Sequence, residues 1–208
     1  MERTVTSETQ LIELLDSILP MVLEKGPSHT TMDYVASALG MSKRTLYEIF
    51  GSKDEMLRQV LQHQHELSQK RAEKIFSESD NIMESMVRLM DMHLEVLQKI
   101  SPDFFRDMDE RCKHLRPHYD SRNEAMNRQV SRIIAMGVKQ GMFRKNCDFE
   151  MNLRLLRVQM ESIKRMEDYF PPQITMAEAF YTIGQGFLRS IATQKGIEYL
   201  DRLENERK

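Results

Sequence analysis

The sequence has 208 residues, of which 40% are hydrophobic and 30% charged, with only 8 glycines and 6 prolines. A chain of this length can bury a core in one domain or two small ones, and the balance favours long helices over sheets and turns. The net charge of −2 excludes an indiscriminate nucleic-acid binder. Neither an ordinary export signal nor an apolar stretch near twenty residues is present, so we expect a cytoplasmic protein that does not span a membrane.

The first helix is predicted over Glu8 to Lys25, where leucine, isoleucine and valine recur at helical spacing until Gly26 and Pro27 end the pattern. Thr31 has the hydroxyl of a helix N-cap and opens a short helix. Gly40 closes that helix, at a position where a left-handed residue is needed.

Another short helix is predicted over Lys43 to Phe50, after a connection of two residues. Ser52 and Glu55 then have the spacing of a capping box, in which Ser52 accepts from the third helical amide and Glu55 reaches back to the cap. A long helix is expected to run from there to about Ser77.

The middle of the sequence also follows a helical pattern. A helix capped by Ser79 or Asp80 is expected to carry apolar residues to Leu97. Pro102 is placed at the first position of a short helix, and Pro117 is expected to open a further helix that reaches a stop at Gly141.

Two helices are expected in the C-terminal part. Asp148 caps one that should reach Asp168, and the other spans Met176–Gln194 behind a second capping box of Thr175 and Glu178. Gly196 is expected to interrupt this last helix before the charged tail. Because no strand alternation or repeat is present, the predicted fold class is all-α.

Two short helices joined by a tight turn at Gly40 predict a helix-turn-helix, whose second helix enters the major groove. Leu46, Ile49 and Phe50 fall at helical spacing and can form its buried back. The polar residues of the same stretch are then left around the exposed end and sides. Solvated cations on a short helix are common, so the charges alone do not establish DNA binding.

Matched positions in a fixed register run through this segment: Gly26, Thr31, Val35-Ala36, Leu39-Gly40-Met41-Ser42, Thr45-Leu46-Tyr47, Phe50, Ser52-Lys53 and Leu57. From Ile18 to Val60 the sequence resembles the DNA-binding domain of the TetR family of bacterial transcriptional regulators. The resemblance implies a three-helix head and a helical C-terminal domain that dimerises and holds a ligand pocket. We therefore expect a helix-turn-helix DNA-binding domain over residues 1–52 and a helical regulatory and dimerisation domain over residues 53–208.

The resemblance also implies roles for residues of the head. Thr31, Tyr47 and Lys53 match phosphate-contacting positions, and the helix N-termini at Thr31 and Lys53 suit an anion. The family positions that contact DNA bases and the DNA backbone correspond here to Ser42, Lys43, Arg44 and Thr45.

Two positions depart from the family pattern. Arg44 stands where many members carry glycine or alanine, and Ile49 where histidine is frequent. Arg44 can bind guanine O6 and N7 with two donors, or it can clamp a phosphate. Residues 1–58 carry six Lys/Arg against nine Asp/Glu, a formal charge of −3, so any DNA contact must depend on a few placed side chains.

The rest of the chain resembles the family in architecture and in the loose pattern QGMFR…DFEMNL that often precedes its dimerisation helices. The last two long helices are expected to pair with their symmetry mates in a four-helix bundle. Their stripes are Leu153, Leu156, Met160 and Ile163 on one helix and Phe180, Gly184, Phe187 and Ile191 on the other. The stripes can also be intramolecular core, and the sequence alone does not separate the two.

The sequence contains 17 methionines, and those of its middle part are candidates for an adaptable apolar pocket. The expected lining residues are Met86, Met90, Phe104, Phe105, Met108, Tyr119 and Met126. Such a pocket favours an apolar or amphipathic ligand, although most of these residues will be plain core. The ligand's identity does not follow from the sequence.

No catalytic or metal constellation is expected. Cys112, His114 and His118 do not have zinc-motif spacing, and Pro117 breaks the helix that would align the two histidines. Cys112 and Cys147 are too few and too far apart for a disulfide framework, which fits a reducing compartment. No cofactor and no enzymatic activity are expected.

Together with the resemblance to the TetR family, these patterns lead us to expect a homodimeric repressor that binds a palindromic double-stranded operator and is released by a small ligand. The alternative is a helical ligand carrier or adaptor whose head no longer binds DNA. An activator or a ligand-independent regulator also fits the sequence.

Overall fold

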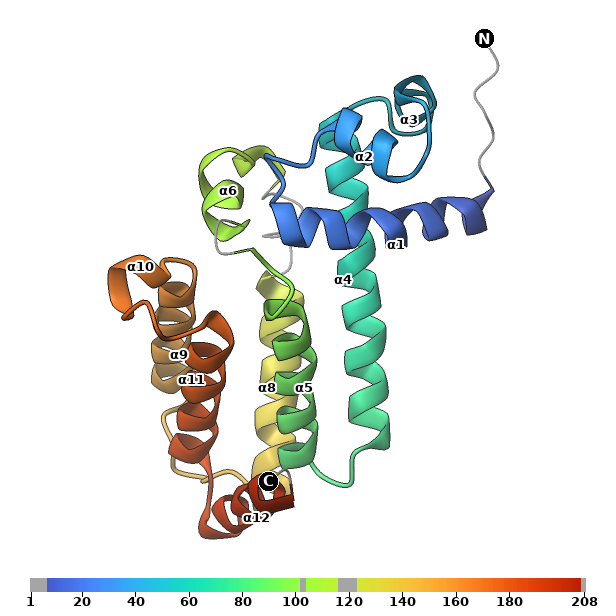
Figure 1. Ribbon diagram of the computed structural model, residues 1–208. Coiled ribbons are helices and arrows are strands. Elements are labelled where there is room, and N and C mark those ends of the chain that lie inside the picture. The colour runs from blue at the N-terminus through green and yellow to red at the C-terminus, as the bar shows by residue number, and fades with distance from the viewer. Residues whose placement is uncertain (1–6, 102–103, 116–122, 207–208) are drawn as a thin grey trace. The chain divides into compact units, whose positions relative to one another are not determined.

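The computed structural model describes residues 7–101, 104–115 and 123–206 (Figure 1). Within these ranges every regular element is a helix, and the one isolated antiparallel bridge joins Phe143 and Ala192. The predicted all-α class is therefore confirmed. None of the helices in the described ranges is long and apolar enough to cross a membrane.

The chain folds into two units, and neither is continuous in sequence. Unit 1 comprises Met1–Arg71 and Lys99–Ser121, and unit 2 comprises Ala72–Gln98 and Arg122–Lys208. The helix α4, Lys53–Glu78, contributes residues to both. The predicted boundary between residues 52 and 53 marks the start of α4, and as a division of function it stays a prediction.

Unit 1 holds the predicted head. Its helices are α1 (Glu8–Lys25), α2 (Met32–Ala38), α3 (Lys43–Phe50), the first part of α4, α6 (Phe104–Glu110) and the short 3₁₀ helix η1 (Lys113–Leu115). The bounds of α1 and α3 are those that the sequence predicts. Ser7 caps α1 in a capping box with Gln10, and Thr31 caps α2, as expected.

The core of unit 1 forms from the buried faces of these helices. Its fully buried members include Ile18, Val22, Leu46, Met56, Leu57 and Val60. The same core also includes Phe104, Cys112 and Leu115, which come after α5 (Ile82–Leu97) in the sequence. The segment around α6 is thus part of the apolar interior that supports α1, α3 and α4.

The turn between α2 and α3 is built by local hydrogen bonds. Gly40 has φ 64°, which lies in the left-handed region and favours glycine. The amide of Met41 donates to the carbonyl of Ala36 at 2.9 Å, so the end of α2 is closed before α3 begins. In Figure 1, α2 and α3 are the two short helices that this turn joins.

Unit 2 consists of the end of α4 with α5 (Ile82–Leu97), α8 (Asn123–Lys139), α9 (Phe149–Ile163), α10 (Met166–Tyr169), α11 (Met176–Ile191) and α12 (Gln194–Glu206). α11 packs against both α9 and α5. The core includes Ile82, Met83, Val87, Phe143, Leu188, Ile191 and Leu200. Asp148 caps α9, and Thr175 with Glu178 forms the predicted capping box of α11.

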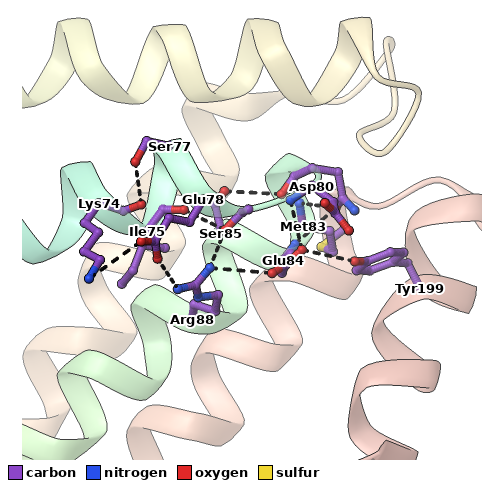
Figure 2. A network of polar contacts seen from close by, with 12 residues as sticks. Lys74, Ile75, Ser77, Glu78, Asp80, Met83, Glu84, Ser85, Arg88 and Tyr199 are labelled. Atoms are coloured by element: carbon purple, nitrogen blue, oxygen red, sulfur yellow. Dashed lines mark hydrogen bonds and ion pairs between the residues drawn. The ribbon is translucent and has the colours of Figure 1, made fainter.

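A polar network joins the end of α4 to α5 (Figure 2). Arg88 of α5 pairs with Glu78 at 3.1 Å and with Glu84 at 3.7 Å. The expectation that Ser79 or Asp80 caps α5 is wrong: the cap is Asn81, whose Oδ1 accepts from the amides of Met83 and Glu84. One Asn81 oxygen thus satisfies two otherwise unpaired donors of the first turn.

The last two long helices end earlier than the sequence suggests. α9 ends at Ile163 because Arg165, with φ −131° and ψ 56°, leaves the helical region before the four-residue α10. α11 ends at Ile191, since Ala192 is extended and the amide of Thr193 donates to the carbonyl of Met142 at 2.9 Å.

Gly196 does not interrupt a helix, contrary to expectation, but lies inside α12. A Cβ at this position would be 2.5 Å from the carbonyl oxygen of Met142. The glycine therefore permits close packing of α12 on the Met142 backbone.

Candidate nucleic-acid interface

The exposed face of α3 presents cations above a buried apolar back. Leu46 and Phe50 are buried in the core of unit 1, while Arg44 and Tyr47 are exposed. Ser42 caps the helix by accepting from the amide of Thr45 at 3.0 Å, and the two hydroxyls lie 2.8 Å apart. The polar residues predicted to contact DNA are thus carried by a short helix whose position is fixed by its buried apolar side chains and its cap.

Lys43 is held by an acidic residue of α2. Its Nζ donates to Oδ2 of Asp33 at 2.8 Å, which places the N-terminal end of α3 beside that of α2. This hydrogen bond to Asp33 raises the pKa of Lys43 above its usual value.

Arg44 is held within its own helix. Its Nε donates to Oε1 of Glu48 at 2.9 Å, one turn further along α3. The Arg44 side chain is 76% exposed. Its guanidinium therefore points away from the core on the same face as Tyr47, which is 43% exposed.

The remaining predicted DNA contacts lie at the N-termini of α2 and α4. Thr31 is exposed, and its hydroxyl accepts from the amide of Tyr34 at 3.1 Å. Lys53 is half-buried, and its Nζ donates to the carbonyl of Ser28 at 2.7 Å. All seven predicted DNA-binding residues belong to unit 1, and their contact with DNA stays a prediction.

A buried carboxylate on α6 was missed by sequence reasoning. The Asp107 side chain is 6% exposed and accepts from both the amide and the hydroxyl of Ser28. His29 Nδ1 lies 3.6 Å and Arg111 Nη1 lies 3.8 Å from its oxygens. Asp107 thus holds Ser28 in the turn between α1 and α2. The carbonyl of Ser28 accepts a hydrogen bond from Lys53.

The hydrogen bonds to Asp107 also determine its ionisation. Burial disfavours the charged carboxylate, but the two hydrogen bonds from Ser28, with His29 and Arg111 nearby, outweigh this and lower the pKa of Asp107 below its usual value. No local pattern in the sequence could have identified this residue, because its partner is 79 positions away.

The residues predicted to line a ligand pocket fall in both units. Phe104, Phe105 and Met108 pack in the core of unit 1, whereas Met86 and Met90 pack in that of unit 2. Tyr119 and the side chain of Met126 lie outside the described residues. A pocket formed by these residues stays a prediction.

Unit 2 contains a buried polar side chain that the sequence did not single out. Gln185 of α11 is buried, and its Nε2 lies 3.3 Å from the hydroxyl of Tyr181. Its Oε1 is buried and has no hydrogen-bond partner among the described residues. A buried acceptor without a partner is costly, so this atom is a candidate contact for a bound donor.

The predicted dimer stripes are partly occupied inside the chain. Ile163, Gly184 and Ile191 are buried, and a Cβ at Gly184 would be 2.7 Å from Met90 Cε. The half-buried members of the stripes are Leu153, Leu156, Met160, Phe180 and Phe187. Their part in a dimer stays a prediction.

A second apolar row on α9 is exposed. Met151, Leu155 and Val158 follow at spacings of four and three, with exposed fractions of 52%, 55% and 69%. This spacing places them on one face of the helix. We refer to these three residues as the α9 row.

The metal motif considered from the sequence finds no support among the described residues, where no cluster of three His, Cys, Asp or Glu could hold an ion. Cys112 is buried, and His114 Nε2 instead lies 3.2 Å from Asp54 Oδ2. His118 lies outside the described residues.

Comparison with known proteins gives the following similarities. The model of the family "Bacterial regulatory proteins, tetR family" matches residues 14–60. The HTH-type transcriptional repressor KstR2 of Mycolicibacterium smegmatis is 25% identical over 150 residues, which cover 70% of this chain and 73% of the relative.

Solved structures share the fold. A regulator from Saccharomonospora viridis in complex with choline has a TM-score of 0.69 and 18% identity, covering 90% of this chain and 100% of the other. The regulator FadR from Bacillus subtilis in complex with stearoyl-CoA has a TM-score of 0.64 and 13% identity, covering 87% of this chain and 99% of the other.

Proposed function

Because this chain belongs to the TetR family of bacterial regulatory proteins, and is a DNA-binding transcriptional regulator rather than an enzyme, we propose that it is a repressor. In this proposal it binds a palindromic operator as a homodimer and leaves the operator when a small ligand binds. The observation that carries the proposal is the exposed face of α3. Lys43, Arg44 and Tyr47 stand there above the buried Leu46 and Phe50, as a recognition helix requires.

The proposed contacts divide into two kinds. The first kind is made by Thr31, Tyr47 and Lys53, which bind phosphates and position the head. Contacts with phosphates carry no sequence information. Ser42, Lys43, Arg44 and Thr45 lie at the N-terminal end of α3, the end that reaches base edges. Because the segment 1–58 has a net charge of −3, these placed groups supply the affinity rather than a basic field.

The homodimer is proposed to form through α9 and α11, with the α9 row in the interface. Apolar side chains that are half exposed or more, in one contiguous row, favour burial against another protein surface. A second copy related by twofold symmetry presents the same row, so the two faces match. Two heads on one face of the duplex then bind half-sites about 34–36 Å apart, which makes the operator palindromic.

The ligand is proposed to bind in unit 2, near Met86 and Met90. Methionine side chains adapt to apolar ligands of different shape, which supports an apolar or amphipathic compound. Gln185 Oε1 adds a buried acceptor that a hydroxyl or N–H group of the ligand would satisfy. The ligand releases DNA only if it binds more tightly to a conformation in which the heads are misplaced.

A helical ligand carrier that no longer binds DNA is the second candidate. The observation in its favour is that Lys43, Arg44 and Lys53 all have internal acceptors, in a head of negative charge. A carrier would keep these contacts permanently. A regulator must exchange some of them for DNA.

Binding to the DNA upstream of its own coding region separates the two candidates. Fluorescence anisotropy of this duplex, against a scrambled duplex of equal length, should show saturable binding of two protomers per site at moderate salt. Addition of apolar or amphipathic compounds that raise the melting temperature should release the duplex. A stable dimer that binds neither duplex above background would support the carrier.

A further inference from the structure

The contact between Arg44 and Glu48 has a geometry suited to more than surface charge balance. The two residues lie one turn apart on the exposed face of α3, and Nε of Arg44 donates to Oε1 of Glu48 at 2.9 Å. Their helix is fixed by the Ser42 cap and by buried Leu46 and Phe50. The carboxylate therefore stands at a defined place relative to the predicted DNA face.

The nitrogen through which Glu48 holds Arg44 determines which donors of the guanidinium remain available to DNA. A guanidinium has five N–H donors in one plane, and the contact with Glu48 uses the single donor on Nε. The two terminal nitrogens form the edge that binds O6 and N7 of guanine with two parallel hydrogen bonds. A carboxylate at Nε is thus compatible with two-point readout and restricts the plane in which it occurs.

The same contact reduces the entropy lost when the arginine binds. An exposed arginine must order several torsions before it can form two hydrogen bonds to one base, and ordering before binding reduces that loss. Lys43 differs, because an ammonium bound to Asp33 is a point charge without a preferred plane.

We propose that Glu48 is a positioning residue for base readout: its carboxylate holds the Arg44 guanidinium through Nε so that the terminal nitrogens are presented to one guanine. The inference depends on the proposed DNA binding. It also gives Glu48 a second effect, since a carboxylate near the duplex disfavours contacts with phosphates alone. Both effects raise the ratio of specific to non-specific affinity.

The alternative is that Arg44 and Glu48 form an ordinary ion pair on an exposed helix, which contributes little to stability. The two readings differ in what DNA binding should show. An ordinary pair changes the affinity for every duplex by the same factor when its charge is removed. A positioning residue changes the preference at one base pair, and only while Arg44 is present.

The experiment begins with wild-type protein and a randomised duplex library, from which the preferred site is selected at fixed salt. Dissociation constants are then measured for the selected duplex and for each single-base variant of it. The variants are Glu48→Ala, Glu48→Gln, Arg44→Ala and the double variant Arg44→Ala/Glu48→Ala. Glu13→Gln, on the exposed side of α1, is the control for net charge.

Arg44→Ala identifies the base pair that Arg44 reads, where a two-point contact discriminates by about 5- to 150-fold. Glu48→Ala should reduce discrimination at that same base pair by about fivefold or more, and should raise affinity for mismatched duplexes. Glu48→Gln, whose amide oxygen still accepts from Nε, should retain most of the discrimination. Glu13→Gln should change no base preference.

The double variant gives the decisive comparison, because Glu48→Ala should alter no base preference in the Arg44→Ala background. The proposal is overturned if Glu48→Ala changes affinity uniformly, if it acts at another base pair, or if its effect persists without Arg44. A uniform effect of Arg44→Ala would overturn it as well, since Arg44 would then clamp a phosphate. If the wild type selects no duplex at all, the proposed DNA-binding function itself fails.

Discussion

The helices α3 and α9 are both amphipathic, but they leave different chemistry on the face that their own chain does not cover. α3 exposes Arg44 and Tyr47 with Lys43 at its N-terminal end, whereas α9 exposes the α9 row. Cations and hydroxyls suit a polyanion, and a contiguous apolar row suits another protein surface. The difference shows that two helices of similar pattern can indicate two different partners.

The two faces also differ in what they lose when a partner binds. On α3, Lys43 has an acceptor in the chain itself, Asp33, so DNA must replace this existing contact, whereas the contact of Glu48 with Nε of Arg44 is kept. The α9 row gives up only contact with water, which is favourable for apolar side chains. Affinity for DNA is therefore expected to be the small difference of competing contacts, while dimerisation is expected to be strong.

Charge placed on the α9 row should have the largest effect. Val158→Glu buries an unpaired carboxylate in the proposed interface, and should split the dimer and lower operator affinity by about a hundredfold or more, because one head then binds one half-site. Sedimentation and anisotropy measure the two effects.

Gln159→Glu is the matched control for Val158→Glu. The residue is exposed and lies about 100° further around α9. It should stay dimeric. A dimeric Val158→Glu variant, or a monomeric wild type at micromolar concentration, would remove the α9 row from the interface.

Removal of the buried carboxylate should have the next largest effect. Asp107→Ala leaves the amide and hydroxyl of Ser28 without their acceptor, which should lower the free energy of unfolding by about 1–3 kcal/mol. Glu110→Ala, exposed on the same helix, is the control and should change little. Equal stability of the two variants would contradict the contacts described for Asp107.

Asp107 also makes stability depend on pH. Its pKa is lowered from 3.8 in the folded state, so its contribution is fully present above that value and is lost as the pH falls through the folded pKa. Chemical denaturation of wild type and Asp107→Ala from neutral pH down to pH about 3 should therefore show the difference in stability shrinking at the acidic end. A constant difference would show that folding does not lower the pKa of Asp107.

Lys53→Ala tests a phosphate contact on unit 1. It should weaken binding to every duplex by the same factor and reduce the slope of log affinity against log salt by about one unit. Lys70→Ala, exposed further along α4, should leave the slope unchanged. A change in base preference with Lys53→Ala would mean that the residue does more than bind phosphate.

Asp33→Asn should have the smallest effect and the opposite sign. It weakens an internal competitor for Lys43 and removes a negative charge from the face of the head, so affinity for all duplexes should rise by about twofold to fivefold. Glu24→Gln, exposed on α1, provides the same change in net charge away from α2. A loss of affinity with Asp33→Asn would indicate that Asp33 orients Lys43 instead of competing for it.

Local signals in the sequence were sufficient where a helix end depends on its own residues. Thr31, Asp148 and Thr175 cap their helices as predicted, because a side-chain oxygen and the following amides settle the geometry. The cap of α5 was misplaced because Ser79, Asp80 and Asn81 are three consecutive residues that can all cap.

Features that depend on distant residues could not be read in advance. The contact between Asp107 and Ser28 joins residues far apart in the chain, and no local pattern encodes it. On α9 both the predicted stripe and the α9 row are apolar at helical spacing, so the sequence did not indicate which face packs against α11. The family resemblance identified the candidate DNA-binding residues, and nothing in the fold alone tests their contacts.

The division of unit 1 into two stretches of sequence affects how this regulator can be recombined with others. Residues 1–71 alone lack Phe104, Cys112 and Leu115 of their core and the Asp107 that holds Ser28. A chimera that transplants only the N-terminal segment onto another body would have to find replacements for these residues in its new host. A graft that also carries the segment around α6 keeps its own support, so modularity in this protein follows the folding unit and not the order of the chain.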